Sequence, residues 1–225
     1  MRTRVGIVAS ARDGAIERGL AALGYELAWL PFEAPADFVE RVVAFAPGVV
    51  LNLGVGRLAD DAARALEVLG ITYTGSTPLA VELARDDALR EAVLRAHGLP
   101  TAGAGRAGRA LTLLLLGNGP ETEARLLPDC APVPGACGAG SPTPSAEPLA
   151  RARALGLAAA RALRCRDHAR VELDLDADGA PRVRAVATDL PALADRWGSR
   201  PAELADRLIR LVAAAPPERR AYQRV

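Results

Sequence analysis

The stretch Gly48-Val-Val-Leu-Asn-Leu-Gly-Val-Gly-Arg-Leu-Ala59 places a short apolar run directly before a glycine-containing turn. The apolar run is typical of a buried strand, and residues 60–69 are predicted to form the helix that follows it. Strands that alternate with helices in this way pair into a parallel sheet whose two faces are covered by the helices. The stretch therefore predicts an α/β fold.

The same alternation continues on both sides of this stretch. Strands are predicted at 4–10, 25–30 and 71–74. One helix is predicted to have Ile16, Leu20 and Leu23 on one face and to be closed by Gly24. A second, capped by Asp37, carries Phe38, Val42 and Phe45 and ends before Pro47, and a third runs from about 78 to 96. Residues 1–100 are therefore predicted to form one Rossmann-like α/β domain.

The composition changes after Thr101, and residues 101–225 are predicted to form a second, smaller α+β region. Residues 101–110 are predicted to be a connector, and 128–148 a loop rich in proline and glycine. The regular elements expected here are a strand at 111–116, a helix at 149–163, a hairpin of 169–176 with 182–188, and a last helix capped by Ser199 with Pro201 in its first turn.

Composition and charge exclude several classes of function. Half of the 225 residues are hydrophobic and 24% are charged, which predicts a packed globular chain. The net charge of +1 gives no electrostatic case for binding nucleic acid or an anionic membrane. The apolar run at 5–9 is too short for a signal peptide or a membrane span. We therefore expect a cytoplasmic protein with neither nucleic acid nor membrane as a partner.

Two residue types limit the chemistry further. The three cysteines, Cys130, Cys137 and Cys165, are odd in number and lack paired metal-ligand spacing, so we expect free thiols and no disulfide framework. All 28 basic residues are arginine. The absence of lysine excludes a Schiff base and the phosphate-binding lysine of a P-loop.

The glycine turn fits the dinucleotide pattern G-x-G-x-x-G/A in form, with Gly54, Gly56 and Ala59. It follows the third strand of the domain, however, and no acidic residue ends the next strand, so we favour a plain strand–helix turn. Ligands also bind beyond the carboxyl ends of such strands. A ligand crevice formed by Asn52, Gly54, Gly56, Gly75 and Ser76 is therefore a further hypothesis.

The predicted hairpin carries charged residues on one face. Arg170, Glu172, Asp174 and Asp176 alternate with apolar residues, which is typical of a solvated strand face. The alternative is the remnant of a metal and phosphate site, in which carboxylates hold Mg²⁺ and an arginine offsets negative charge. The partner strand offers only alanines at 185 and 187 to complete such a site.

Several segments together resemble the D-alanine–D-alanine ligases, which are ATP-grasp carboxylate–amine ligases. The most specific are the run Leu-Gly-Ile-Thr-Tyr-Thr-Gly-Ser and the hairpin that begins Ala-Arg-Val-Glu. The segments are 49–56, 65–76 and 94–101 for the N-terminal half of the family, and 113–120 and 162–179 for the C-terminal part. The resemblance implies a pre-ATP-grasp domain followed by an ATP-grasp region, a homodimer, and ATP with Mg²⁺ as the family's cofactors.

The departures from the family pattern fall at its functional positions. Asp87 and Glu91 stand where the family has phosphate-binding lysines, and most of the small ATP-gripping subdomain is missing after Thr101. Arg170 and Glu172 match the family's catalytic arginine and first metal carboxylate. The family's Glu-x-Asn metal pair is matched by Ala185 and Ala187, and its substrate loop is shortened to 190–193.

The resemblance and the departures lead to three hypotheses. The first is a degenerate, non-catalytic binding or partner subunit that needs no cofactor and forms a homodimer or binds another protein. The second is an ATP-dependent carboxylate–amine ligase that uses ATP and Mg²⁺ through an altered or partner-completed site. The third is a small-molecule binder that uses the crevice at 52–56.

Overall fold

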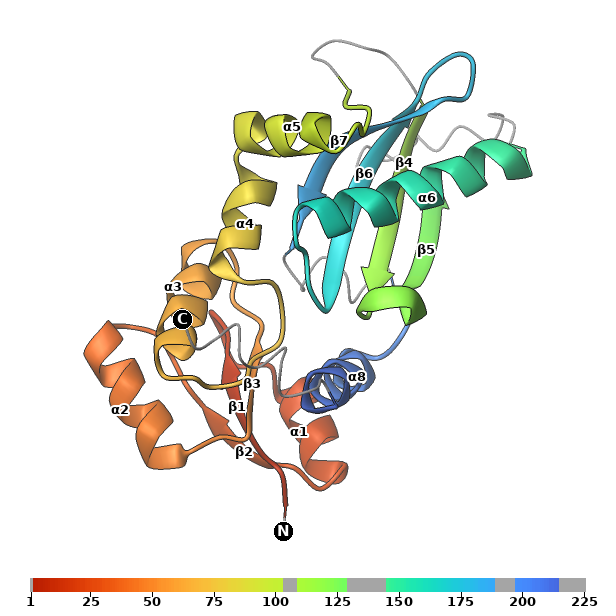
Figure 1. Cartoon of the computed structure of the whole chain (residues 1–225). Coiled ribbons are helices and arrows are strands. Elements are labelled where there is room, and N and C mark those ends of the chain that lie inside the picture. The colour runs from red at the N-terminus through yellow and green to blue at the C-terminus, as the bar shows by residue number, and fades with distance from the viewer. Residues whose placement is uncertain (1, 103–108, 129–144, 189–196, 215–225) are drawn as a thin grey trace. The chain divides into compact units, whose positions relative to one another are not determined.

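The computed structural model describes residues 2–102, 109–128, 145–188 and 197–214 (Figure 1). The chain packs into two compact units. The first consists of Met1–Pro78 together with Asp189–Val225, and the second of Leu79–Thr188. The first unit is thus built from two separate stretches of sequence.

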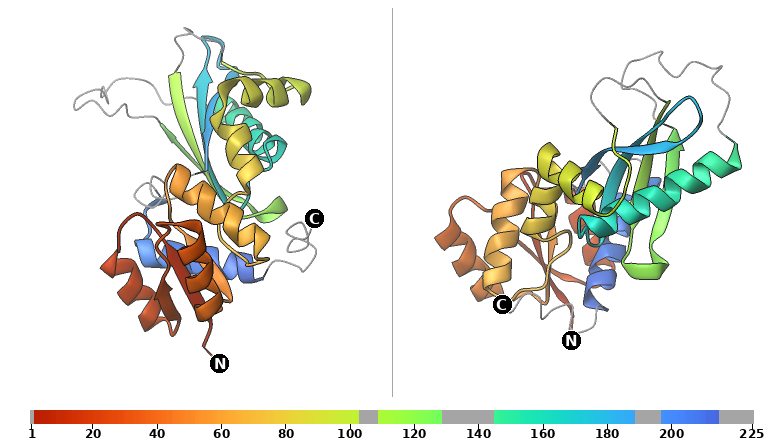
Figure 2. Two further views of the ribbon diagram at one scale, coloured as in Figure 1. Left: turned by 90° about the vertical axis from the view of Figure 1, so that its left-hand side faces the viewer. Right: turned by 45° about the horizontal axis from the view of Figure 1, so that its top comes forward.

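The first unit contains a parallel sheet with the order β2-β1-β3. Its strands are β1 (Arg4–Val8), β2 (Glu26–Trp29) and β3 (Val49–Asn52), and its helices are α1 (Gly14–Ala22), α2 (Pro35–Phe45), α3 (Arg57–Val68) and α8 (Pro201–Ala213). Helices α2 and α3 bury apolar side chains against one face of the sheet, and α1 and α8 against the other (Figures 1 and 2). The predicted α/β fold with a parallel sheet is confirmed.

The second unit contains an antiparallel sheet with the order β5-β4-β6-β7. Its strands are β4 (Arg109–Leu116), β5 (Glu123–Pro128), β6 (His168–Leu175) and β7 (Pro181–Ala187); its helices are α4 (Pro78–Arg85), α5 (Asp87–Ala96), the short η1 (Gly119–Glu121) and α6 (Ala146–Ala162). Helix α6 covers one face of this sheet, where Gly156 lies directly against the Leu113 side chain (Figure 1).

Several local predictions were wrong. Residues 71–74 form no strand; Tyr73 makes only an isolated bridge to Val50, because the extended run is short and Gly75 follows at φ +103°. The helix predicted over 78–96 is two helices, since the Asp86 side chain accepts a hydrogen bond from the Leu89 amide and caps α5. Strand β5 was not predicted.

Two predicted helix caps were also wrong. Helix α2 begins at Pro35, so Asp37 lies inside the first turn instead of capping it. The N-cap of helix α8 is Arg200, whose backbone amide donates to the Glu203 side chain at 3.4 Å, and not Ser199. In both cases proline takes the first helical position, where its missing N–H costs nothing, and this fixes the helix start.

Some predictions fall on residues outside the described part of the chain. These are the connector residues 103–108, most of the predicted loop at 128–148, the shortened loop at 190–193, Cys130 and Cys137. Cys165 is a free cysteine.

The domain boundary at residue 100 stays a prediction. The packed units divide the chain differently, because α4 and α5 contribute to the core of the second unit and α8 to that of the first. Among the described helices, none has the length and apolar character needed to cross a membrane.

Candidate functional site

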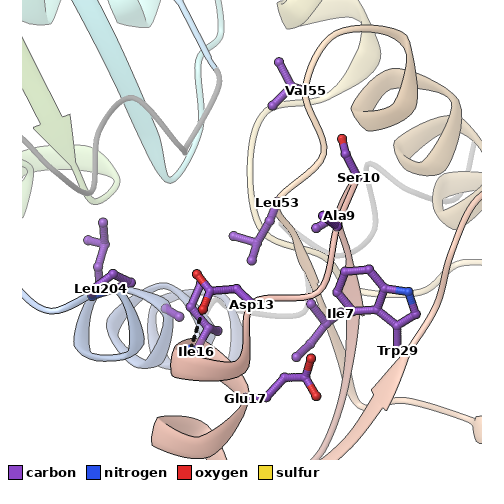
Figure 3. Close-up of a pocket in the computed structure, with 13 residues that line it drawn as sticks. Ile7, Ala9, Ser10, Asp13, Ile16, Glu17, Trp29, Leu53, Val55 and Leu204 are labelled. Atoms are coloured by element: carbon purple, nitrogen blue, oxygen red, sulfur yellow. Dashed lines mark hydrogen bonds between the residues drawn. The ribbon is translucent and has the colours of Figure 1, made fainter.

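A cavity of about 300 Å³ lies at the carboxyl ends of β1 and β3 (Figure 3). The chain leaves β1 toward β2 on one side, and β3 lies on the other side of β1. The connections after two neighbouring strands therefore diverge, which opens a crevice at the position where α/β sheets commonly bind ligands. The described residues that line it are Ile7, Ala9, Ser10, Ala11, Asp13, Ile16, Glu17, Trp29, Leu53, Val55, Pro201, Leu204 and Ala205.

The loop after β1 and the start of α1 form one wall. Asp13 is the N-cap of α1, and its Oδ1 accepts hydrogen bonds from the amides of Ala15 (2.8 Å) and Ile16 (3.2 Å). This cap satisfies helix N–H groups that would otherwise lack partners. Because Ile16 is buried against the sheet, the first turn of α1 is fixed and Asp13 is held beside the cavity.

The two carboxylates that line the cavity, Asp13 and Glu17, differ in whether a cation pairs with them. Arg12 donates two hydrogen bonds to Glu17, at 3.0 and 2.6 Å, and its guanidinium lies 5.9 Å from the centre of the Trp29 ring. The hydrogen bonds from Arg12 hold the pKa of the Glu17 carboxyl below its usual value. Among the described residues Asp13 forms no ion pair. The carboxylate of Asp13 is therefore the charge in the described lining that no cation of the described residues offsets.

Helix α8 supplies the opposite wall although it lies at the far end of the sequence. The Tyr25 hydroxyl donates a hydrogen bond of 2.7 Å to Asp206 Oδ1, and Arg210 donates to the same carboxylate at 3.0 Å. Burial, followed by the hydrogen bond to Asp206, raises the pKa of Tyr25. At Gly19, α1 approaches Ala202 of α8 so closely that a methyl group would collide with it.

The residues of the predicted crevice hold the β3–α3 turn together. The Asn52 side-chain amide donates to the Ala59 carbonyl at 3.0 Å, and its Oδ1 accepts from the Gly54 amide at 3.1 Å. A Cβ on Gly54 would lie 2.8 Å from the Ala59 nitrogen, so this position requires glycine. Gly56 has a φ of +60°, which glycine adopts without strain.

The loop between β3 and α3 contributes to both the cavity and the predicted crevice, but the two sites have no residue in common. Leu53 and Val55 line the cavity, whereas none of the predicted residues Asn52, Gly54, Gly56, Gly75 and Ser76 belongs to its described lining. Sequence reasoning missed Asp13 and the contribution of α8 to the cavity. The diverging connections after β1 and β3 could have pointed to Asp13, while no local pattern indicates that α8 returns to the first unit.

The hairpin places Ala185 and Ala187 across from the charged residues of β6, as the sequence predicted. Arg170 pairs with Ala187 and Glu172 pairs with Ala185 across the β6–β7 ladder. The register shifts between Glu172 and Leu173, which leaves Arg184 as an additional residue on β7. A bulge of this kind redirects side chains.

Arg184 uses this position to contact two carboxylates. Its Nη2 lies 3.3 Å from Glu172 Oε2 and its Nη1 lies 3.2 Å from Asp174 Oδ1. Arg170 Nη2 lies 3.6 Å from the other oxygen of Glu172. Glu172 is thus paired with a cation at each oxygen. In the described part of the chain, no group of three or more His, Cys, Asp or Glu side chains has an arrangement that could hold a metal ion.

The acidic residues at the family's lysine positions also have cationic partners. On α5, Asp87 pairs with Arg90 at 2.7 Å, and Glu91 pairs with Arg95 at 2.6 Å. Arg90 further donates to the carbonyl of Arg184 on β7 at 3.1 Å. These acidic residues therefore form ion pairs along one helix, and Arg90 connects that helix to the hairpin.

Comparison with known proteins identifies relatives for part of the chain. It is 35% identical to the D-alanine–D-alanine ligase of Moorella thermoacetica over 89 residues, which cover 39% of this chain and 28% of that protein. It is 32% identical to the ligase of Paramagnetospirillum magneticum over 117 residues, covering 48% and 37%. The matched segments are thus much shorter than these relatives. No family model matches the chain.

Solved structures match the fold over nearly the whole chain. The D-alanine–D-alanine ligase of Bacillus anthracis, solved in complex with ATP, superposes with a TM-score of 0.73 at 16% identity and 99% coverage of both chains. The ligase from Coxiella burnetii gives a TM-score of 0.66 at 14% identity, covering 99% of this chain and 96% of the other. Part of the chain is therefore similar in sequence to D-alanine–D-alanine ligases, and nearly the whole chain has the fold of those enzymes.

Proposed function

We propose that the protein is a non-catalytic relative of the D-alanine–D-alanine ligases that acts as a binding or partner subunit. The observation that carries this proposal is the environment of Glu172, whose two oxygens face Arg170 and Arg184 while Ala185 lies opposite on β7. Mg²⁺ takes about six oxygen ligands in near-octahedral order. A carboxylate between two guanidinium groups, with alanine across the ladder, is poorly suited to that coordination.

The α5 residues support the same proposal. Asp87 and Glu91 place negative charge where the resemblance puts phosphate-binding lysines. Each charge-assisted hydrogen bond to phosphate contributes about 1.5–3 kcal/mol, so the loss of two removes much of the affinity for a nucleotide. A carboxylate in the same place additionally repels phosphate.

The packed cores support retention of the fold for a purpose other than ligation. Both sheets keep continuous apolar clusters, and the cavity of the first unit is independent of the charged hairpin. The proposal includes a cytoplasmic location and a homodimeric or hetero-oligomeric state, and it requires no cofactor. The expectation of a homodimer or another protein partner rests on the family resemblance.

One observation favours a second candidate function. Arg170 and Glu172 occupy the positions of the family's catalytic arginine and metal carboxylate, on a fold similar to that of an ATP-bound ligase. In this alternative the protein is an ATP-dependent carboxylate–amine ligase in which arginines replace lysines or a partner completes the site. ATP and Mg²⁺ would then be its cofactors, with Glu172 as a metal ligand.

Calorimetric titration with Mg·ATP, together with an assay for ADP release in the presence of D-alanine, separates the two candidates. We expect no binding in the micromolar range and no D-alanine-dependent ADP release. Micromolar binding, or ADP release that Glu172→Ala abolishes and the control Asp178→Asn leaves intact, would reject the proposal. Asp178 suits the control because it is exposed in the turn of the same hairpin.

A further inference from the structure

The cavity at the ends of β1 and β3 has walls of unequal character. Its volume of about 300 Å³ lies at the lower end of the range for small-molecule pockets, about 300–1,000 Å³. Side chains such as Ile16, Leu53 and Leu204 make most of the described lining apolar, and the polar side chains are Ser10, Asp13 and Glu17 (Figure 3). A small molecule that is mostly apolar fits this composition.

The charged side chains of the lining favour some of these molecules over others. The described lining contains two carboxylates and no cationic side chain. Arg12 offsets the charge of Glu17, so the carboxylate of Asp13 is the lining charge that has no ion-pair partner among the described residues. A ligand cation near Asp13 would supply that partner, and the charge-assisted hydrogen bond would orient the ligand.

An anionic group, in contrast, finds no complementary charge there. A helix N-terminus commonly attracts anions through its free amide groups. In α1, however, the amides of Ala15 and Ile16 already donate to Asp13. A carboxylate or phosphate placed at this helix end would meet the Asp13 carboxylate instead of the amides of Ala15 and Ile16.

We propose that this cavity binds a small primary amine whose remaining part is apolar and carries no carboxylate or phosphate. The ammonium group would lie near Asp13, and the apolar part would contact Ile16, Leu53 and Leu204. This inference rests on the proposed function because it takes the protein to be a binding protein, and it names the class of ligand.

Three probes with the same branched five-carbon skeleton test the charge preference. The full-length protein is titrated with 3-methylbutylamine, 3-methylbutan-1-ol and 3-methylbutanoate, and binding is followed by protein-observed NMR. We expect the amine to bind most tightly and to shift the resonances of Ser10, Asp13 and Leu204. The alcohol is expected to bind about tenfold more weakly, because it lacks the charge-assisted hydrogen bond, and the carboxylate not measurably.

A matched pair of variants tests the role of Asp13. Asp13→Asn removes the charge but keeps an equally good N-cap, so α1 is expected to stay folded. We expect this variant to bind the amine about tenfold more weakly and the alcohol unchanged. The control Asp37→Asn alters an exposed carboxylate in the first turn of α2, away from the cavity, and is expected to change neither affinity.

Three outcomes would overturn the inference: no probe binds, the carboxylate binds as tightly as the amine, or Asp13→Asn leaves amine binding unchanged. Asp13→Ser, which also removes the charge and keeps a good N-cap, serves as a second test with the same expected result if Asp13→Asn does not fold. Failure here is distinguishable from failure of the proposed function. Absence of amine binding with no ATP turnover rejects only the ligand class, whereas ATP turnover rejects the non-catalytic proposal whatever the amine does.

Discussion

At the scale of single residues, Arg164 shows how a helix end stores strain. Helix α6 ends at Ala162, Leu163 is its C-cap, and Arg164 follows with a φ of +58° in the left-handed region. Left-handed backbone costs a residue with a Cβ about 1–2 kcal/mol, which is why glycine is common directly after a helix. Arg164 is exposed, so its side chain is not needed for packing.

We expect Arg164→Gly to stabilise the protein by about 0.5–1 kcal/mol, since relief of the strain exceeds the entropy that glycine loses on folding. Urea unfolding followed by circular dichroism measures the change. Arg161→Gly, in the last turn of the same helix, is the control and should destabilise by about 1 kcal/mol. A destabilising effect of Arg164→Gly would contradict the role assigned to the left-handed conformation.

The residues of the charged hairpin give a prediction about metal. The Glu172 side chain is 27% exposed, and solvent screens ion pairs at this level of exposure. We expect Glu172→Gln to lower the melting temperature by at most about 4 °C, which corresponds to about 1 kcal/mol for a chain of this size. Addition of about 10 mM Mg²⁺, a concentration suited to weak sites, should leave melting unchanged in both proteins.

Scanning calorimetry with and without Mg²⁺ measures whether Glu172 binds the metal, with Asp178→Asn as the control in the same hairpin. Stabilisation of the wild type by Mg²⁺ that is lost only in Glu172→Gln would mean that a working metal site survives. The sequence anticipated that Ala185 lies across the hairpin from the charged strand, because the predicted turn at 177–179 brings the two strands together. It did not anticipate Arg184, because the bulge that places this side chain beside Glu172 shifts the register by one residue.

At the scale of secondary-structure elements, the contact between α1 and α8 joins the two ends of the sequence. Gly19 faces Ala202 with no room for a side chain on Gly19. Substitutions that overpack such a contact cost about 1–3 kcal/mol, which exceeds the gain of about 1 kcal/mol from replacing glycine by alanine in a helix. We therefore expect Gly19→Ala to destabilise the protein by about 1 kcal/mol.

The double variant Gly19→Ala with Ala202→Gly moves the methyl group from one helix to the other and should recover most of the lost stability. Chemical denaturation of the single and double variants gives the coupling energy between the two positions. Strictly additive effects would show that α1 and α8 are not in contact at this point.

Elements with a repeating apolar pattern were the ones that the sequence could predict. The strands around Val5 and Val49 and the helices of the first unit follow from that periodicity, as do the two strands of the charged hairpin. Boundaries set by a single hydrogen bond could not be derived, such as the break at Asp86. Strand β5 was missed because its stability comes from pairing with β4, a contact that its own residues do not reveal.

At the scale of the whole molecule, the cavity depends on a long-range feature of the chain. The first unit is completed by α8, whose Leu204 and Ala205 line the cavity more than 130 residues after β3. The sequence predicted α8 as an amphipathic helix but not the sheet that it covers. An apolar stripe shows that a helix is packed against something, and only the tertiary structure shows against what.

The family resemblance also predicts a homodimer through the N-terminal domain. The first unit carries exposed apolar side chains on neighbouring helices: Val43 on α2 is 63% exposed and Val68 on α3 is 88% exposed. Covering such side chains in an isologous interface would remove apolar surface from water in both copies. We expect light scattering to give twice the mass of one chain.

Two variants test whether the expected dimer interface includes the surface of α3. Val68→Glu places a charge on a side chain that is almost fully exposed within one chain, so it should leave the fold intact and shift the measured mass toward that of a single chain. The control Leu79→Glu alters an apolar residue of the second unit that is 55% exposed and should leave the mass at twice that value. A wild-type protein that stays monomeric at every concentration would contradict the dimer. A dimer that both variants preserve would instead place the interface away from Val68, because a buried, unpaired carboxylate at the centre of an apolar contact costs several kcal/mol and could not be tolerated there.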